Sequence, residues 1–279
     1  MLQIERLDEN TFRGHCHAGS PTRTFGGHVA AQALVAAGRT CGDRRPVHSL
    51  HGYFLRPGSP ARPIDYLVER VREGTSYTTR RVTAVQKESE IFTLSVSFKH
   101  PEPAADRRRS IPPLPRPESL PNAVARLPEE VRRALAASGG FRDLDLRFVP
   151  SDTPGLPPVV PGLLQQFVWM RTASPLPDDD QLLHAGALTY LSDLTLASTV
   201  GLDVQPNFFQ RTEPPRLLMA SLDHAMWFHR PFRADEWLLF AQRSPSSSDG
   251  RGLALGEFYD LDGRLVASAV QEALVRDPS

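Results

Sequence analysis

The residues best able to do chemistry gather in one short stretch, residues 221–232, which reads Ser-Leu-Asp-His-Ala-Met-Trp-Phe-His-Arg-Pro-Phe. A hydroxyl, a carboxylate and two imidazoles in this stretch could support hydrolysis or metal binding. His224 and His229 lie five positions apart in an expected strand, so their side chains face opposite sides of the sheet. This spacing disfavours a shared metal ion, and we expect no metal site in the chain.

Three further features bear on the type of chemistry. The sequence has no Gly-x-Ser-x-Gly motif, which disfavours a hydrolase with a serine nucleophile. Residues 15–17 read His-Cys-His, but neighbouring side chains alternate between faces and the chain offers few other soft ligands. The three consecutive arginines at 107–109 could attract phosphate groups, although a solvated charge run in a linker is the simpler interpretation.

A fainter copy of the opening stretch occurs at residues 49–57, Ser-Leu-His-Gly-Tyr-Phe-Leu-Arg-Pro. Phe-x-Arg-Pro begins at Phe54 in this copy and at Phe228 in the other, 174 positions apart. The same offset relates residues 80–86 to 254–260 and residues 91–98 to 265–272. A constant offset over several elements indicates an internal duplication, in which one fold is used twice.

The bulk composition is that of a globular protein in a reducing compartment. The chain has 279 residues, a formal net charge of zero and two cysteines. A neutral balance argues against nucleic acid as a partner, and no window is apolar enough for a membrane helix. The first residues lack the pattern of a signal peptide, and so few cysteines make a disulfide framework unexpected. We therefore expect a cytoplasmic protein that binds neither nucleic acid nor membrane.

The elements that must position the chemistry follow one pattern in each half. In the first half, a short strand at 11–17 and an alanine-rich helix at 28–38 precede four strand-like runs. These runs are expected at 47–55, 64–72, 76–86 and 91–100. One helix followed by consecutive strands predicts an antiparallel sheet wrapped on a helix, an α+β architecture rather than alternating βαβ units.

The second half repeats this order after a proline-rich segment. We predict a strand at 164–171, a helix at 184–198 and strands at 216–230, 237–243, 253–259 and 265–276. Between the halves, we expect an extended linker at about 101–128, a short helix at 128–138 and a strand at 144–149. The domain boundaries predicted from these patterns are 1–100 for the first repeat, 101–143 for the linker and 144–279 for the second repeat.

Four motifs in the chain closely resemble the acyl-CoA thioesterase II (TesB-like) family. They are Phe-Gly-Gly-His-Val-Ala-Ala-Gln-Ala-Leu at 25–34, the segments 47–58 and 222–232, and Val-Ala-Ser-Ala-Val-Gln-Glu at 266–272. The resemblance implies a double hot-dog fold, with two long helices each wrapped by antiparallel strands that form one extended curved sheet. It also implies hydrolysis of acyl-CoA to free fatty acid and CoA without a metal or prosthetic group, in a homodimer or homotetramer.

In that family an Asp, a Ser or Thr and a Gln in the second half hold the attacking water. The matching positions here are Asp193 on the second helix, Ser221 before Leu-Asp-His, and Gln271 in the last strand. The resemblance also implicates His48, Gly27 and His28 in substrate binding. A structural hydrogen-bonding role is the simpler interpretation of His48, and His28 stands where Gln is common.

The residue types suit this chemistry. A carboxylate whose pKa is raised by burial can accept a proton from water, while an amide and a hydroxyl orient that water. Backbone N–H groups at a helix N-terminus, expected near 184–186, could stabilise the oxyanion. Taken singly, Asp193 could be a satisfied buried polar group, Ser221 a structural hydroxyl and Gln271 a solvent-facing strand residue.

Two other functions stay open on the sequence alone. A hot-dog hydratase or dehydratase would move a proton on the acyl chain with an Asp–His pair, for which the chain shows no convincing candidate at a helix start. A non-catalytic module that binds acyl-CoA or an acyl carrier would need none of these groups for chemistry. Thioester hydrolysis followed by thiol release distinguishes all three.

Overall fold

The fold was determined from a computed structural model of the protein. It describes residues 2–20, 23–42, 45–103, 105–107, 114–137, 144–158, 160–211 and 213–277. Much of the predicted linker is therefore included, but Arg108 and Arg109 of the basic run lie outside the described residues.

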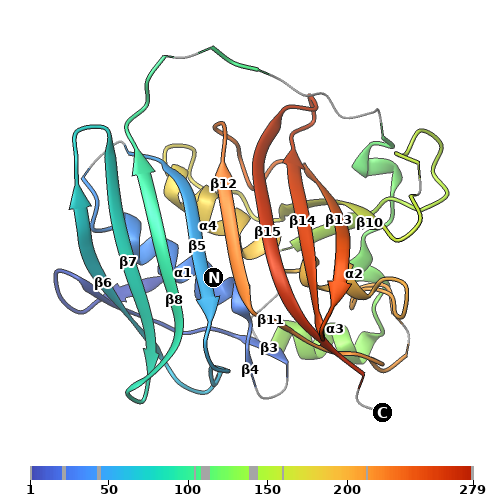
Figure 1. Ribbon diagram of the computed structural model, residues 1–279, viewed down its shortest axis with the longest axis horizontal. Coiled ribbons are helices and arrows are strands. Elements are labelled where there is room, and N and C mark those ends of the chain that lie inside the picture. Colours follow the sequence, from blue (N-terminus) through green and yellow to red (C-terminus); the bar gives the residue numbers. More distant parts are fainter. Residues whose placement is uncertain are drawn as a thin grey trace.

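Among the described residues, thirteen strands form one sheet in which every neighbouring pair is antiparallel (Figure 1). The strands from the first half are β1 (Ile4–Arg6), β2 (Thr11–Gly14), β5 (Val47–Phe54), β6 (Ile64–Glu73), β7 (Tyr77–Gln86) and β8 (Ser89–Lys99). Those from the second half are β9 (Leu144–Phe148), β10 (Leu164–Thr172), β11 (Leu218–Ser221), β12 (Asp223–Phe228), β13 (Leu238–Ser248), β14 (Arg251–Tyr259) and β15 (Leu265–Arg276). A separate pair, β3 (Ala18–Ser20) and β4 (Arg23–Thr24), lies outside this sheet.

The strand order is symmetric about the junction between β5 and β12. From that junction outward, one side runs β5, β8, β7, β6, β2, β1 and the other β12, β15, β14, β13, β10, β9. His51 of β5 pairs directly with Ala225 of β12, and these two residues are 174 positions apart. Each half therefore completes the sheet of the other across this junction, and the α+β hot-dog architecture with one large antiparallel sheet is confirmed.

Two helices lie behind the broad face of the sheet in Figure 1, α1 (Gly26–Gly38) and α4 (Gln181–Ser192). They pack against one another in opposite directions. The start of α1 meets the end of α4 at Gly27 and Asp193, and the end of α1 meets the start of α4 at Gly38 and Leu182. Every residue from 27 to 37 is buried, so the small side chains of α1 allow close approach on all sides.

The prediction of two long helices was wrong in its lengths. The α1 helix has 13 residues and α4 only 12, and the other described helices are shorter: α2 (Ala123–Arg126), α3 (Glu129–Ala137), and the 3₁₀ turns η1 (Pro117–Ser119) and η2 (Ala197–Gly201). The helix expected at 184–198 ends at Ser192. Beyond that point the chain continues as turns and the 3₁₀ turn η2. Thr195 and Thr199, which have low helix propensity, are buried there, and their side chains hydrogen-bond Gln242.

The proline-rich segment is also more ordered than predicted. Where an extended linker was expected, η1 and α2 form, and Leu120 and Leu127 are buried. The indole of Trp169 donates a hydrogen bond to the carbonyl of Pro115, which ties the segment to β10. Apolar residues in a proline-rich stretch therefore dock on the second half.

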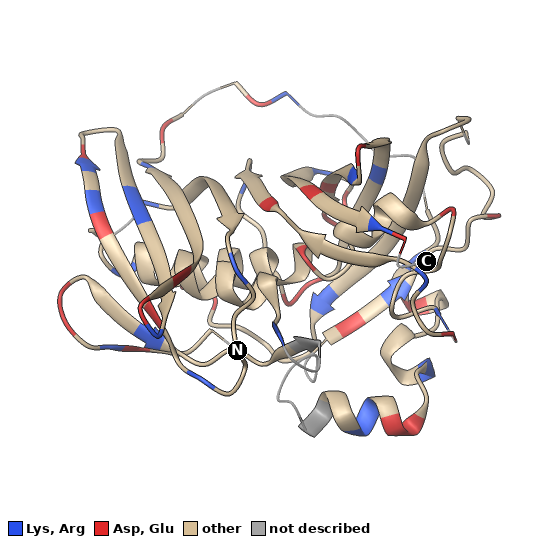
Figure 2. Cartoon of the chain, turned by 60° about the horizontal axis from the view of Figure 1, so that its bottom comes forward, with Lys and Arg blue, Asp and Glu red and all other residues tan. Residues whose placement is uncertain are grey.

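Charged residues of both signs are interspersed along the strands in Figure 2. Cross-strand ion pairs such as Arg81–Glu69 and Arg251–Glu272 account for part of this pattern. No helix among the described residues is long and apolar enough to cross a membrane.

Candidate active site

Asp193 lies where the two halves meet. It is the C-cap residue of α4, directly after the last helical residue, and its side chain is buried. Its Oδ1 accepts a hydrogen bond of 2.6 Å from the Gln271 amide and a longer one of 3.4 Å from the Ser221 hydroxyl. Its Oδ2 accepts a bond of 2.6 Å from the backbone N–H of Gly27. Two of the residues matched from the family motif, Gln271 and Ser221, thus converge on the carboxylate of the third, Asp193.

The double glycine at the start of α1 makes this approach possible. A Cβ at Gly27 would lie 2.8 Å from the Cβ of Asp193, and one at Gly26 would lie 3.0 Å from Oδ2. The N-cap position is held by Phe25, whose apolar side chain provides no cap. The carboxylate of Asp193 therefore caps α1 from the other half of the chain, at the positive end of the helix dipole.

Gln271 and Ser221 reach the carboxylate from adjacent strands. Gln271 lies on β15 and is fully buried, so it does not face solvent, as a strand residue taken singly could have done. Ser221 is the last residue of β11 and is half-buried. The chain breaks regular pairing at Leu222 before β12 begins, which leaves the Ser221 hydroxyl beside the end of α4.

The environment changes the acidity of Asp193. Burial raises the pKa of Asp193 from 3.8 to about 6, while the hydrogen bonds from Gln271, Gly27 and Ser221 oppose this shift. At neutral pH most of the carboxylate is still ionised and can accept a proton. Its pKa lies close to the value that suits a general base near pH 7.

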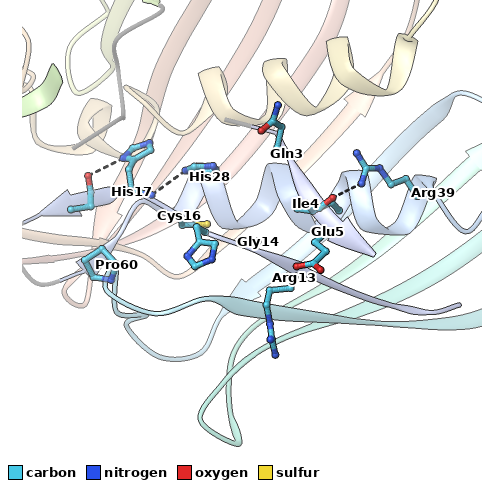
Figure 3. A pocket seen from close by; sticks show the side chains of 12 residues that line it. Gln3, Ile4, Glu5, Arg13, Gly14, Cys16, His17, His28, Arg39 and Pro60 are labelled. Atoms are coloured by element: carbon cyan, nitrogen blue, oxygen red, sulfur yellow. Dashed lines mark hydrogen bonds between the residues drawn. The ribbon is translucent and has the colours of Figure 1, made fainter. Parts of the chain in front are cut away.

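Gly27 and His28 are adjacent in sequence, but they differ in what they contact. Gly27 donates to Asp193, as described above. The His28 ring points the other way, where its Nδ1 accepts a hydrogen bond of 3.3 Å from the backbone N–H of His17 and its Nε2 lies 3.1 Å from the amide of Gln32. His28 also lines a cavity of ≈ 910 Å³ together with Cys16 and Arg13 (Figure 3).

His48 occupies the start of β5, far from the carboxylate. Its Nε2 lies 2.8 Å from the hydroxyl of Ser97, and its ring meets Tyr77 edge-on. Phe54, at the other end of the same strand, is the residue that lies against Gly26. Six residues of extended strand, roughly 20 Å, separate the two ends. The structure therefore does not bring His48 together with Asp193.

The helix N-terminus expected to stabilise an oxyanion was assigned to the wrong helix. Residues 184–186 lie inside α4, towards the end opposite Asp193 and roughly 13 Å from it along the helix axis. His184 is fully buried there and its Nδ1 accepts the backbone N–H of Ala234. The N-terminus at the site is that of α1. In the sequence, the double glycine at the start of α1 was the signal for this N-terminus, because only glycine allows Asp193 to approach the helix end so closely.

No group of three or more His, Cys, Asp or Glu side chains within the described part of the chain is arranged to hold a metal ion.

Comparison with known proteins identifies the family. The sequence profile of the acyl-CoA thioesterase N-terminal domain matches residues 17–99, and that of the acyl-CoA thioesterase C-terminal domain matches residues 112–275. The chain belongs to the acyl-CoA thioesterase family. The resemblance drawn from the four motifs is thereby confirmed.

Individual relatives align with almost the full length of this chain. Acyl-coenzyme A thioesterase 8 from Homo sapiens is 34% identical over 99% of this chain and 88% of its own. Acyl-CoA thioesterase 2 from Haemophilus influenzae is 33% identical over 99% and 96%. The crystal structure of the acyl-CoA thioesterase II TesB2 from Mycobacterium marinum superposes with a TM-score of 0.82 at 44% identity, covering 100% of this chain and 97% of that one.

Proposed function

We propose that this chain hydrolyses acyl-CoA thioesters to a free carboxylic acid and CoA, by direct attack of a water molecule held by Asp193, Ser221 and Gln271. The observation that carries the proposal is the convergence of an amide and a hydroxyl on one carboxylate oxygen. A carboxylate, an amide and a hydroxyl together supply a proton acceptor and the groups that orient a water.

The proposed reaction needs no covalent enzyme intermediate. The oxygen of the bound water attacks the thioester carbonyl carbon while Asp193 takes its proton. The tetrahedral intermediate then collapses, the C–S bond breaks, and the proton passes from Asp193 to the departing CoA thiolate. The raised pKa of Asp193, about 6, suits both accepting and returning that proton.

Negative charge that develops on the thioester oxygen would be favoured beside the start of α1. The backbone N–H groups of a helix N-terminus and its dipole stabilise an anion at that end. The Gly27 N–H is itself donated to Oδ2 of Asp193, so this contact brings the end of α1 against the proposed base and leaves the helix dipole to act on the oxyanion.

The geometry favours hydrolysis over the hydratase or dehydratase alternative. That alternative uses an Asp–His pair, whereas Asp193 receives its hydrogen bonds from an amide, a hydroxyl and a backbone N–H. A non-catalytic binding module has no use for a buried carboxylate with a raised pKa, since burying a charge is costly.

Thiol release from a panel of acyl-CoAs of different chain length tests the proposal. Asp193→Ala and Gln271→Ala should each lower kcat by about 10² or more, because base and orienting groups are lost. Asp223→Asn is a matched control: Asp223 is a half-buried carboxylate nearby on β12, and it accepts the backbone N–H of Glu272 instead. Full activity in Asp193→Ala would refute the assignment of the base.

The same reasoning supports a division into residues 1–100, a linker at 101–143 and residues 144–279 as two hot-dog repeats. The symmetric strand order supports this division, with the carboxylate, hydroxyl and amide all supplied by the second repeat. Assembly into a homodimer or homotetramer is proposed from the family resemblance, and light scattering of the purified protein tests it.

A further inference from the structure

Two buried polar atoms beside the proposed site have no hydrogen-bond partner within the described residues. They are Nδ1 of His224 and Oε1 of Gln271. The His224 side chain is 1% exposed and the Gln271 side chain 0%, so water cannot satisfy either atom freely. Buried polar atoms are almost always paired, and an unpaired one in each of two neighbouring side chains needs an explanation.

The two residues are neighbours across the sheet. The pairing of β12 with β15 begins at Ala225 opposite Val270, and His224 and Gln271 are the next residue of each strand beyond that pair. Both side chains lie on the buried face, in step with the burial of alternate residues along each strand. Residues opposite one another in an antiparallel pair hold their Cβ atoms about 4.5–5.5 Å apart, within reach of a ring and an amide.

We propose that His224 is a positioning residue for Gln271. It holds a neutral ring whose Nδ1–H donates to the Gln271 Oε1 and so turns the amide NH₂ towards Asp193. The other ring nitrogen, Nε2, lies 2.8 Å from the hydroxyl of Ser192. The single proton of that hydroxyl has the Thr189 carbonyl, also at 2.8 Å, as another acceptor, and in the proposed arrangement it is donated to Nε2. A directed chain then runs from the Ser192 hydroxyl through the imidazole and the amide to the carboxylate.

The alternative arrangement is unfavourable at the carboxylate. If Nε2 carried the ring proton, Nδ1 could only accept, and the amide would turn its NH₂ towards the ring. The carbonyl oxygen of Gln271 would then face the Asp193 carboxylate at the position where the amide nitrogen now donates over 2.6 Å. Two acceptors in contact repel, so an ionised Asp193 and the Nδ1–H form of His224 require each other.

The ring remains neutral over the relevant pH range. Burial lowers the pKa of His224 to about 4, while Gln271 acts on that pKa in the opposite direction, as expected for neighbouring groups. The other groups that face Asp193 do not titrate there, since they are the Ser221 hydroxyl and the Gly27 N–H. The neighbouring His28 ring on α1 is turned to His17 and Gln32.

The position of the ring proton can be measured without any assay of activity. In protein labelled with ¹⁵N-histidine at about pH 7.5, two-bond ¹H–¹⁵N correlations should show His224 as the Nδ1–H tautomer. Its signals are assigned by their loss in His224→Asn. An Nε2–H tautomer at this pH would overturn the proposal and leave the proposed hydrolysis untouched.

The catalytic consequence rests on the proposed function, and two variants of similar size test it. His224→Asn places an amide nitrogen near the position of Nδ1, whereas His224→Gln places it near that of Nε2. We expect His224→Asn to keep about tenfold more of kcat than His224→Gln, because misplacing a positioned group costs up to about 10² in rate. Equal losses in the two variants would contradict the proposal.

The pH profile separates positioning from a structural role. When the amide of Gln271 no longer donates, the pKa of Asp193 should rise, because that hydrogen bond lowers it. The acid limb of kcat/KM in His224→Gln should therefore move above its wild-type position, and an unmoved limb would contradict the proposal. If the unmodified protein hydrolyses no acyl-CoA, the proposed function fails while the tautomer measurement still decides the role of His224.

Discussion

Gly27 and Asp193 join the two halves of the protein through one short hydrogen bond. The backbone N–H of Gly27, at the start of α1, donates to Oδ2 of Asp193, at the end of α4, over 2.6 Å. The residue that caps one central helix is therefore also the proposed base. Stability of the helix pair and placement of the carboxylate depend on the same contact.

Substituting Gly27 tests this dependence. Gly27→Ala adds a Cβ that would lie 2.8 Å from the Asp193 Cβ and equally close to the Phe25 ring. The helix end and the carboxylate must separate, so we expect kcat to fall by about 10² and Tm to drop. Gly42→Ala is the matched control, since a Cβ there meets nothing within 4 Å. Equal activity of the two variants would show that the close approach is unimportant.

The pH dependence of kcat/KM should report the ionisation of Asp193. Burial raises the pKa of this carboxyl to about 6, and only the ionised form accepts a proton from water. We expect kcat/KM to rise tenfold per pH unit below about pH 6 and to level off above it. Initial rates between pH 4.5 and pH 8, with stability checked at each pH, measure this, and a profile flat down to pH 4.5 would exclude Asp193 as the base.

The raised pKa of Asp193 also makes the stability of the fold depend on pH, in the opposite direction to that of a carboxylate in a salt bridge. The folded-state pKa of Asp193 is raised, so the folded protein holds the proton more tightly than the unfolded chain. Ionisation therefore costs stability, and this cost appears as pH rises from about 4 to about 6 and persists above.

The stability of Asp193→Asn relative to the wild type should accordingly increase with pH. The introduced amide can still accept the Gly27 N–H, but its NH₂ group cannot accept the hydrogen bonds that Gln271 and Ser221 donate, and this loss is the same at every pH. Relative to the wild type, the free energy of unfolding should therefore be about 2–3 kcal/mol more favourable to the variant at pH 7 than at pH 4. Urea unfolding of both proteins at the two pH values measures this change, and no change between pH 4 and pH 7 would contradict the raised pKa.

Arg80 provides a test that concerns folding and not the site. Its guanidinium is fully buried on β7, where it donates to the Thr40 hydroxyl over 2.8 Å, to the Thr40 carbonyl over 3.0 Å and to the half-exposed Glu73. Arg80→Met leaves these acceptors unpaired, so we expect a loss of about 2–4 kcal/mol in stability.

Arg81→Met on the same strand is the control for Arg80→Met. Arg81 is exposed and pairs with exposed Glu69, so its loss should cost less than about 1 kcal/mol. The kcat of folded Arg80→Met should stay near the wild-type value, because neither Arg80 nor its partners contact Asp193. Equal stabilities of the two variants would show that the buried network contributes little.

Much of the fold was predictable because strands and turns leave local signals. The alternating runs at 64–72 and 265–276 became β6 and β15 almost residue for residue. The 174-residue offset indicated an internal duplication, and the direct pairing of His51 with Ala225, which lie 174 positions apart, agrees with it. Period-two burial and turn residues are properties of neighbouring positions, so they can be read from the sequence alone.

Helix length was less predictable because it depends on partners from elsewhere in the chain. The run of leucines and threonines at 184–198 reads as one helix, yet it ends at Ser192. Beyond that residue the chain continues as turns and η2, and the side chains of Thr195 and Thr199 hydrogen-bond Gln242 from β13. A local pattern does not contain such contacts between distant parts of the chain.

The sequence by itself determined the residue types at the proposed site and the repeat that carries them. Asp193, Ser221 and Gln271 stand in motifs long enough to be recognised without coordinates. Only the tertiary structure decided what surrounds them: α1 provides the helix end that contacts the carboxylate, and His224 faces Gln271 from the adjacent strand. The reason is physical. Hydrogen-bond direction and burial arise from residues distant in the chain, and they exist only once both halves have closed around the two helices.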